Sequence, residues 1–349
     1  MPFVPQHHEV AILNQKKGLR FLVLIRSLIN RTLANRYRFG GFTLAFLLCA
    51  CGDSSTTEPL IEVQRPAINV ATSTNIIKDW AQQVGGDRVT VFSVQPLGSD
   101  PHHIQPSAQD IALVSRADLL LTVGLGLEAE WIDKLLRNVV DGSLAPAKLG
   151  ETIDPSSLLQ GVGHEHHGDK DHEVYDPHFW LDPLKTKIVV SEIARLLSSL
   201  DPDGSETYQD NAANYMLQLD ELHQWTEERV SMVSADQKLL VTSHGSLQYF
   251  AHRYGFEIVD TIFTGLASES EPSALELTKL TNEIRNSNIS TIFAEGTTSP
   301  KLATAIANET GAKLITGLYT DSLGLAGQGA DTYIGMMKTN INIIVGALE

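Results

Sequence analysis

Four polar residues of the kinds that bind divalent metals stand where predicted strands end, or in the loops just beyond them. They are His102, His178, His244 and Asp321. Open α/β sheets place their ligands outside the carboxyl ends of the strands, so we expect these side chains to lie at one site. Imidazoles and carboxylates are common protein ligands of zinc. The pattern therefore indicates a candidate metal site.

Two of these residues directly follow a proline. Pro101 precedes His102 and Pro177 precedes His178, and a proline fixes the local backbone, which keeps each imidazole on a stiff turn as preorganised ligation requires. Taken singly, each residue is a weak signal, because a histidine beside a proline is more often structural and Asp321 could cap a helix. The joint occurrence of the four residues favours a binding site.

Several neighbouring residues carry weaker indications. His103 is expected to point away from the site, and it is the one alternative ligand at its turn. Asp100 is a candidate for orienting an imidazole from behind. The remaining residues are predicted to pack around the site (Glu128, Trp131 and Trp180) or to lie at the surface (His223 and His252).

A histidine-rich segment, residues 163–173, lies just ahead of His178. It holds four histidines and four acidic residues in eleven positions. The histidines, His164, His166, His167 and His172, are candidates for auxiliary metal capture. Such a tract can collect metal weakly and raise its concentration near a site. The alternative is a solvated insertion without that role.

Strands and helices alternate along the chain, which predicts mostly parallel sheets flanked by helices. The first series has strands at 67–72, 89–94 and 118–123, and helices at 75–84, 107–115 and 128–140. The second series has strands at 239–242, 257–260, 291–294 and 313–316. Its helices are one that ends at 254, two at 272–286 and 300–310, and a last one that begins at about 332. The predicted fold class is α/β with two lobes, with the site in the cleft between them.

A stretch without proline or glycine lies between the two series, at residues 205–234. Its apolar residues have near-helical spacing, which predicts one helix of about 45 Å joining the lobes, with an ordinary surface helix as the alternative. The predicted organisation is an N-terminal lobe at 67–204, a linking helix at 205–235 and a C-terminal lobe at 236–349.

The first 50 residues have the features of a secretion signal. An apolar run of about 12 residues, too short to span a bilayer, follows basic residues and ends at Cys49-Ala-Cys51. Residues 48–52 resemble the lipobox of bacterial lipoproteins, in which the chain is cut before the cysteine that is then acylated. Cys51 is therefore the predicted lipid anchor, with plain secretion as the alternative. The polar residues 51–66 are a predicted flexible tether.

The charge and the cysteines exclude several functions. The net charge of −16 comprises +6 on residues 1–50 and −22 on the remainder. This argues against nucleic acid or anionic lipid as a partner and suits a cationic ligand. Both cysteines lie at the end of the apolar run, and Cys51 is the predicted lipid anchor, so the mature body has no disulfide, thiolate metal site or cysteine nucleophile. The glycine-rich residues 124–127 and 324–329 lack the pattern of a nucleotide-binding turn.

Over nearly its whole mature length the chain resembles the metal-binding subunits of zinc and manganese ABC importers, the cluster of substrate-binding proteins with a rigid linking helix. The motifs that carry the resemblance are numerous and follow the same order as in that family. They are Asp100-Pro-His102 with Pro106, residues 117–121 with 124–131, residues 176–180, Ser243-His244 with residues 249–250 and 253–255, residues 271–274, residues 293–295 with 299–302, and residues 320–322 with 336–340.

The resemblance implies a ligand set. Carried over residue by residue, the family's ligand positions fall on His102, His178, His244 and Asp321. The third position varies between His and Glu in the family and is His244 here. Three imidazoles and one carboxylate suit Zn²⁺, whereas Mn²⁺ prefers more oxygen ligands, so zinc is the expected metal and manganese the alternative. Many zinc-type relatives lack the aspartate and have a longer histidine-rich loop, which leaves the choice of metal open.

The resemblance also implies capture and delivery rather than catalysis. The expected protein is a monomer, lipid-anchored on the extracytoplasmic side, that passes its metal to an ABC permease and its ATPase. Four protein ligands close a zinc centre, whereas catalytic zinc keeps an open position. One alternative is a secreted zinc-dependent hydrolase with Asp321 as its base, although the chain has no H-E-x-x-H helix. Another is a metal-binding adhesin or buffering lipoprotein without an importer.

Overall fold

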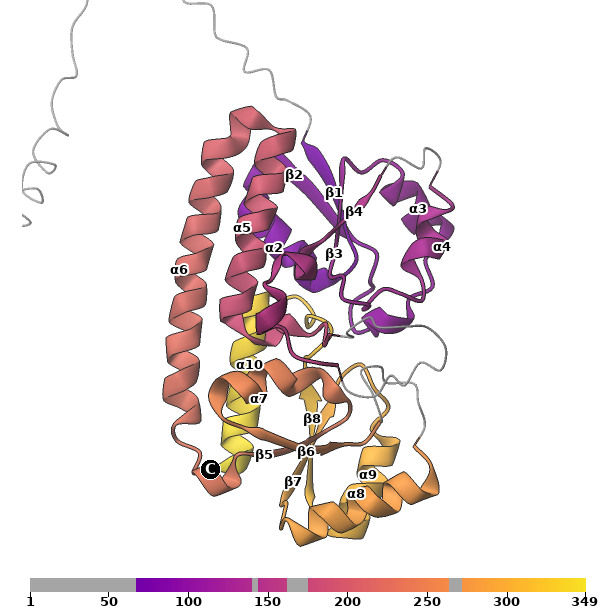
Figure 1. Ribbon diagram of the computed structural model, residues 1–349, viewed down its shortest axis with the longest axis vertical. Coiled ribbons are helices and arrows are strands. Elements are labelled where there is room, and N and C mark those ends of the chain that lie inside the picture. Colours follow the sequence, from indigo (N-terminus) through magenta and orange to yellow (C-terminus); the bar gives the residue numbers. More distant parts are fainter. Residues whose placement is uncertain (1–66, 140–143, 162–174, 264–271) are drawn as a thin grey trace, which may run out of the picture. The chain divides into compact units, whose positions relative to one another are not determined.

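The computed structural model describes residues 67–139, 144–161, 175–263 and 272–349. The signal region, Cys51, the tether and the histidine-rich segment lie outside these residues. The remainder has the predicted α/β architecture with two lobes, each containing parallel strands and helices (Figure 1). Among the described residues, no helix is long and apolar enough to cross a membrane.

The first lobe is built on a four-stranded parallel sheet with the order β2-β1-β3-β4. Its strands are β1 (Ile68–Thr72), β2 (Val89–Ser93), β3 (Leu119–Thr122) and β4 (Pro146–Lys148). Strand β3 holds three successive leucines because both its faces are buried: Leu119 and Leu121 pack in one hydrophobic cluster and Leu120 in another. The predicted strands of this lobe are confirmed, and β4 was not predicted.

The helices of the first lobe are α2 (Asn75–Gly85), α3 (Ala108–Val114) and α4 (Ile132–Leu136). The first two match their predicted ranges, and the Ser107 and Asp110 side chains form a capping box at the start of α3. The helix predicted at 128–140 is wrong in length. Residues 124–126 have positive φ, and Glu128 accepts hydrogen bonds from the backbone of residues 123 and 124. Because these residues form a turn, the helix begins only at Ile132.

The second lobe has two pairs of parallel strands rather than one continuous hydrogen-bonded sheet. Strand β5 (Leu239–Thr242) pairs with β6 (Glu257–Thr261), and β7 (Thr291–Glu295) pairs with β8 (Lys313–Leu318). Strands β5 and β7 lie next to each other. The helices of this lobe are α7 (Gln248–Tyr254), α8 (Ala274–Asn286) and α9 (Lys301–Thr310). All four predicted strands are confirmed to within two residues.

Three further helices pack together beside the lobes (Figure 1). They are α5 (Pro183–Leu200), α6 (Ser205–Val230) and α10 (Tyr333–Leu348). The predicted linking helix is α6, which ends four residues earlier than expected and packs along α5. Helix α5 was not predicted, and α10 contacts α6 and α2 as well as β8. The linking helix is thus supported by a layer of helices, while the exact domain boundaries stay a prediction.

Candidate metal site

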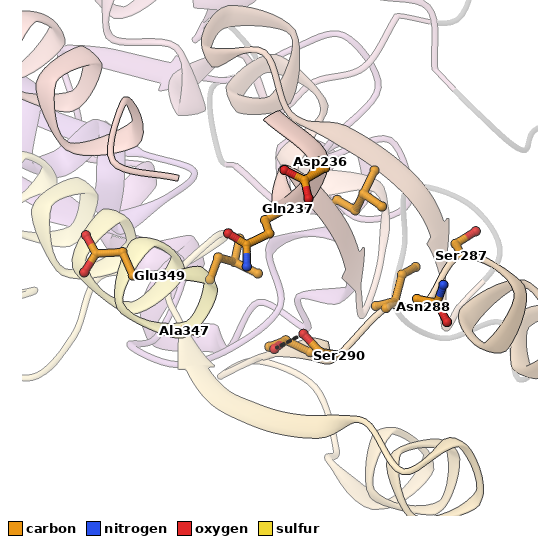
Figure 2. A pocket seen from close by; sticks show the side chains of 11 residues that line it. Asp236, Gln237, Ser287, Asn288, Ser290, Ala347 and Glu349 are labelled. Atoms are coloured by element: carbon orange, nitrogen blue, oxygen red, sulfur yellow. Dashed lines mark hydrogen bonds between the residues drawn. The ribbon is translucent and has the colours of Figure 1, made fainter. Parts of the chain in front are cut away.

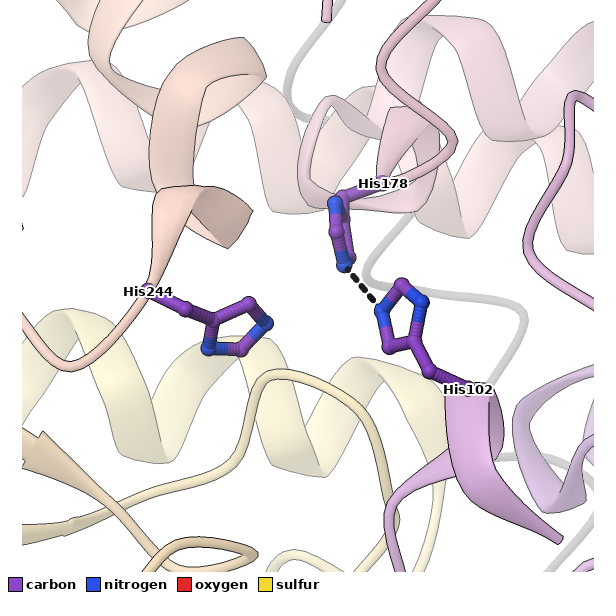
Figure 3. Close-up of side chains that lie close together, drawn as sticks. All are labelled: His102, His178 and His244. Atoms are coloured by element: carbon purple, nitrogen blue, oxygen red, sulfur yellow. Dashed lines mark hydrogen bonds between the residues drawn. The ribbon is translucent and has the colours of Figure 1, made fainter. Parts of the chain in front are cut away.

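The four predicted ligand residues lie together in the interior of the protein. The Nε2 atom of His102 is 3.2 Å from that of His178. The Asp321 carboxylate lies 3.5 Å from His178 Nε2 and 3.2 Å from His244 Nε2. None of the four side chains belongs to a residue more than 7% exposed. Figure 3 shows the three imidazoles facing a common centre.

Three buried polar atoms of the ligand residues have no hydrogen-bond partner among the described residues, namely both ring nitrogens of His244 and Oδ1 of Asp321. The Glu295 carboxylate contacts Nδ1 of His244, which leaves Nε2 of His244 and Oδ1 of Asp321. Buried polar atoms are nearly always partnered, so such orphans need an explanation. A cation bound between the imidazoles and the carboxylate would satisfy both atoms. The donor set, three nitrogens and one carboxylate, therefore fits a divalent transition metal.

The two first-lobe histidines are held by the same kind of turn. Asp100 Oδ1 accepts the backbone N–H of His102 at 2.8 Å, and Asp176 Oδ1 accepts the backbone N–H of His178 at 2.9 Å. Asp176 Oδ1 also lies 2.7 Å from His178 Nδ1. This contact turns Nε2 of His178 toward the centre. The imidazole-orienting role predicted for Asp100 is thus seen at Asp176, its counterpart in the second turn.

His244 is oriented by a carboxylate that the sequence analysis did not identify. The Glu295 carboxylate, at the end of β7, contacts Nδ1 of His244. Its other oxygen accepts a 3.3 Å hydrogen bond from the Ser246 hydroxyl. Glu295 therefore directs Nε2 of His244 toward Asp321. The available signal was an acidic residue at the end of a buried strand, where a charge is costly unless it has a partner.

The electrostatics of the cluster differ from residue to residue. Burial lowers the pKa of His102 well below its usual value, and His178 beside it acts in the same direction. Burial alone would lower the pKa of His244, but the carboxylates of Glu295 and Asp321 outweigh it and raise that pKa well above its usual value. Burial alone would raise the pKa of Asp321, but His244 and the other imidazoles outweigh it and lower that pKa well below its usual value. Asp321 is therefore ionised and His102 neutral at neutral pH.

Two tryptophans pack at the site, as predicted, and each also makes a hydrogen bond. The indole N–H of Trp131 donates to the carbonyl of Pro101 at 2.8 Å, and that of Trp180 donates to the carbonyl of Thr320 at 2.7 Å. Each bond fixes the residue immediately before a predicted ligand. Glu128 was expected in the same role, but its contacts hold the turn after β3.

The other histidines of the described residues, His103, His223 and His252, lie outside the cluster. His103 points to Glu130, with Nδ1 3.0 Å from the carboxylate, so it is not the ligand at its turn in this structure. His252 is exposed, as predicted. His223 was predicted at the surface, and its side chain is 18% exposed. It is half-buried, 3.2 Å from the Tyr254 hydroxyl, where it joins α6 to α7.

A separate pocket of about 500 Å³ lies in the second lobe. It is lined by polar residues such as Asp236 and Asn288 and by the end of α10 (Figure 2). The pocket includes Leu239 and Thr291, the first residues of β5 and β7. His244 and Glu295 stand at the opposite ends of these strands, so the pocket has no part in the metal cluster.

The chain is similar to known metal-binding proteins along most of its length. Residues 70–347 match the family described as zinc-uptake complex component A, periplasmic. The chain is 31% identical over 315 residues to the manganese-binding lipoprotein MntA of Halalkalibacterium halodurans, covering 90% of this chain and 98% of that protein. It is 28% identical to the manganese ABC transporter substrate-binding lipoprotein PsaA of Streptococcus pneumoniae, covering 87% and 95%.

The chain is also similar to solved structures of metal-binding proteins. The periplasmic zinc binding protein TroA from Treponema pallidum superimposes with a TM-score of 0.72 at 28% identity, covering 81% of this chain and 99% of that structure. A manganese-bound periplasmic metal binding protein from Candidatus Liberibacter asiaticus gives a TM-score of 0.69 at 27% identity, covering 81% and 100%. The similarity extends over both lobes and the helices beside them.

Proposed function

The chain belongs to the periplasmic zinc-uptake complex component A family, and we propose that it captures a divalent transition metal outside the cytoplasm for delivery to an ABC importer. The observation that carries the proposal is the buried convergence of three imidazole Nε2 atoms and one carboxylate. The protein is a binding protein and not an enzyme. Neither the hydrolase nor the importer-free adhesin has support among its relatives.

In this proposal His102, His178, His244 and Asp321 bind the metal directly. Asp176 and Glu295 each accept the Nδ1 proton of one imidazole, so that the Nε2 lone pair faces the ion. His102 is already neutral, and Asp321 supplies the negative charge. The cluster is buried, so the captured ion would be shielded from water.

We further propose that zinc is preferred over manganese. Nitrogen ligands outnumber oxygen ligands here, and manganese favours oxygen-rich sites. The relatives give no support for this preference, because MntA and PsaA are named for manganese and TroA for zinc. The preference rests on the three imidazoles alone.

The membrane anchor and the transport partners are also proposals for this chain. Cys51 is the proposed acylated residue, and the mature protein would be a monomer tethered to the outer side of a membrane. Relatives named as lipoproteins of metal transporters support an anchored, extracytoplasmic protein. An ABC permease and its ATPase would receive the metal.

The auxiliary role of the histidine-rich segment depends on where its two ends lie. Gln160 and Tyr175, on either side of the segment, form an antiparallel bridge. The backbone N–H of Asp176 also donates to the carbonyl of Leu159 at 2.9 Å. The described residues that flank the segment therefore lie next to each other, and Tyr175 stands just ahead of His178 in the chain. This supports weak metal collection by His164, His166, His167 and His172 close to the buried site.

Competitive titration of tag-free protein with zinc and manganese tests the proposal. We expect one tight site that zinc occupies in preference to manganese at equal concentration. A chain from which residues 163–173 are deleted should retain that site, because the four proposed ligands lie outside the segment. A zinc affinity in the micromolar range or weaker would contradict the proposed capture function, and a preference for manganese would contradict only the choice of metal.

A further inference from the structure

The loop that carries Asp321 is held by amide side chains of the other lobe. Asp321 follows β8 of the second lobe, yet its carbonyl accepts a 2.8 Å hydrogen bond from Gln95 Nε2, just beyond β2 of the first lobe. Two residues further on, the backbone N–H of Leu323 donates to Asn75 Oδ1 at 2.8 Å. The backbone of this loop is therefore fixed from the first lobe on both sides of Ser322.

The residue between these two bonds is fixed as well. The Ser322 hydroxyl accepts hydrogen bonds from Asn75 Nδ2 at 3.0 Å and from the backbone N–H of Gly98 at 2.8 Å. The two amides are also connected to each other, because the backbone N–H of Asn75 donates to Gln95 Oε1 at 3.0 Å. One network thus joins the start of α2, the end of β2 and the loop after β8.

Both amides are buried, with Asn75 5% and Gln95 3% exposed. Gln95 Nε2 donates a second bond to the carbonyl of Ser99, and both polar atoms of Asn75 are engaged by the loop. Moving the loop away would leave buried donors and acceptors without partners, which costs free energy for each group. The network therefore favours a single position of the Asp321 loop.

We propose that Asn75 and Gln95 are positioning residues for the metal site, which hold Asp321 where it meets the imidazoles. Asp321 belongs to the second lobe, but residues of the first lobe hold it in position. Both anchors stand at the ends of regular elements, and Asn75 is the first residue of a helix capped by Thr74, so the support is stiff. The inference rests on the proposed function, because only there does Asp321 bind the metal.

Two variants and a matched control test the proposal. Asn75→Ala removes both side-chain bonds to the loop, and Gln95→Met keeps the side-chain volume but removes the bond to Asp321. Asn211→Ala serves as control, because the half-buried Asn211 makes a single 3.0 Å bond between helices, to the carbonyl of Val84. If Asn75→Ala fails to fold, Gln95→Met still decides the question.

Two readouts separate positioning from a general structural effect. In the protein without metal, the amide of Leu323 should exchange its hydrogen faster in Asn75→Ala than in the wild type, with no change in Asn211→Ala. Zinc affinity should fall by about 10- to 100-fold in Asn75→Ala and Gln95→Met, as is typical when groups that orient a ligand are lost. Unchanged exchange at Leu323 together with unchanged affinity would overturn the proposal.

A double-mutant cycle completes the test. Once Asp321→Ala has removed the ligand, adding Asn75→Ala should cause no further loss of zinc affinity, because positioning acts through Asp321. Additive losses would show that Asn75 acts elsewhere and would overturn the positioning role alone. If Asp321→Ala itself leaves zinc affinity unchanged, the proposed ligand set fails and the positioning role fails with it.

Discussion

The two halves of the proposed metal site are supported in different ways. In the first lobe, the backbone of His102 and that of His178 are each bound by an aspartate two residues earlier. In the second lobe, His244 is oriented by Glu295, 51 residues away, and the Asp321 carbonyl is bound by Gln95, 226 residues away. The first pair of ligands is thus held by local turns, whereas the second pair depends on the completed fold.

The local turn is not specific to metal binding. Asp154 Oδ1 accepts the backbone N–H of Ser156 at 2.9 Å, and Asp182 Oδ1 accepts that of Leu184 at 3.0 Å, both across an Asp-Pro pair. In these four cases Asp-Pro-X forms a turn closed by the aspartate, whereas the Asp201 side chain before Pro202 makes no such bond. A histidine in the third position makes the turn a candidate to carry a ligand. Of the four turns compared, only those with histidine lie in the metal cluster.

The largest expected effect comes from removing one ligand of either lobe. His178→Ala and His244→Ala should each lower zinc affinity by more than about 100-fold. This exceeds the loss expected for residues that only orient a ligand, because a closed site loses one of its four ligands. The exposed His252→Ala is the matched control. Competition against a chromophoric chelator measures all three. If one lobe's histidine can be removed without effect, the division of the ligands between the lobes is wrong.

A smaller effect is expected from the carboxylates that orient the imidazoles. Asp176→Asn and Glu295→Gln should each reduce zinc affinity by about 10- to 100-fold, because the Nδ1 contact loses its charge. Asp176→Asn should be the milder change, since an asparagine oxygen can still accept the backbone N–H of His178 and keep the turn. Chelator competition provides the affinities. A greater loss of zinc affinity for Asp176→Asn than for Glu295→Gln would contradict the view that His178 is held by its local turn and His244 by Glu295.

The pH dependence should also differ between the two pairs. The pKa of His244 is raised, so below that pKa the imidazole carries a proton that the metal must displace. The pKa of His102 is lowered, so this residue releases no proton near neutrality. Zinc affinity should therefore weaken as pH falls, with release of about one proton per bound ion. Calorimetry in buffers of different ionisation enthalpy measures the protons, and a pH-independent affinity would contradict this assignment.

The smallest effect on the metal site is expected at the start of β2, the end of that strand opposite to Gln95. Arg88, just before β2, lies 2.5 Å from Asp201. Burial raises the pKa of Asp201, but Arg88 and Tyr208 outweigh it and lower that pKa below 3.8. The pair therefore stabilises the fold above about pH 4, and this contribution is lost as pH falls through the lowered pKa.

Asp201→Asn should lower the free energy of unfolding at pH 7 only slightly, since Arg88 is partly exposed and exposed ion pairs contribute little. Zinc affinity should stay at the wild-type value. Denaturant titrations at pH 7 and pH 3 provide the check, because the difference between wild type and variant should shrink at pH 3. A loss of zinc binding in this variant would mean that the helix layer supports the site more directly than its contacts indicate.

The sequence allowed prediction of what depends on local pattern. The strand ranges are confirmed to within two residues because apolar runs between turn residues mark buried strands. The helix predicted at 128–140 was wrong because Glu128 bonds the turn at residues 123–124 instead of continuing a helix. The four proposed ligands do converge, as predicted, although His178 follows no strand directly.

The supporting residues could not be predicted in the same way. Asp176 is part of an Asp-Pro-His motif, so its role was within reach of the sequence. Glu295, Gln95 and Asn75 are ordinary polar residues near strand or helix ends, and their roles arise only when distant segments meet. Nothing local distinguishes a glutamine that fixes a loop 226 residues away from one that faces solvent.

We propose that one metal ion is bound by two ligands from each lobe. Anomalous diffraction from crystals of the zinc-loaded protein would locate this ion. We expect one strong zinc peak about 2.0–2.1 Å from the Nε2 atoms of all three histidines and at a similar distance from an Asp321 oxygen. A strong peak held by His103 or by the histidine-rich segment, with no peak among His102, His178, His244 and Asp321, would contradict it.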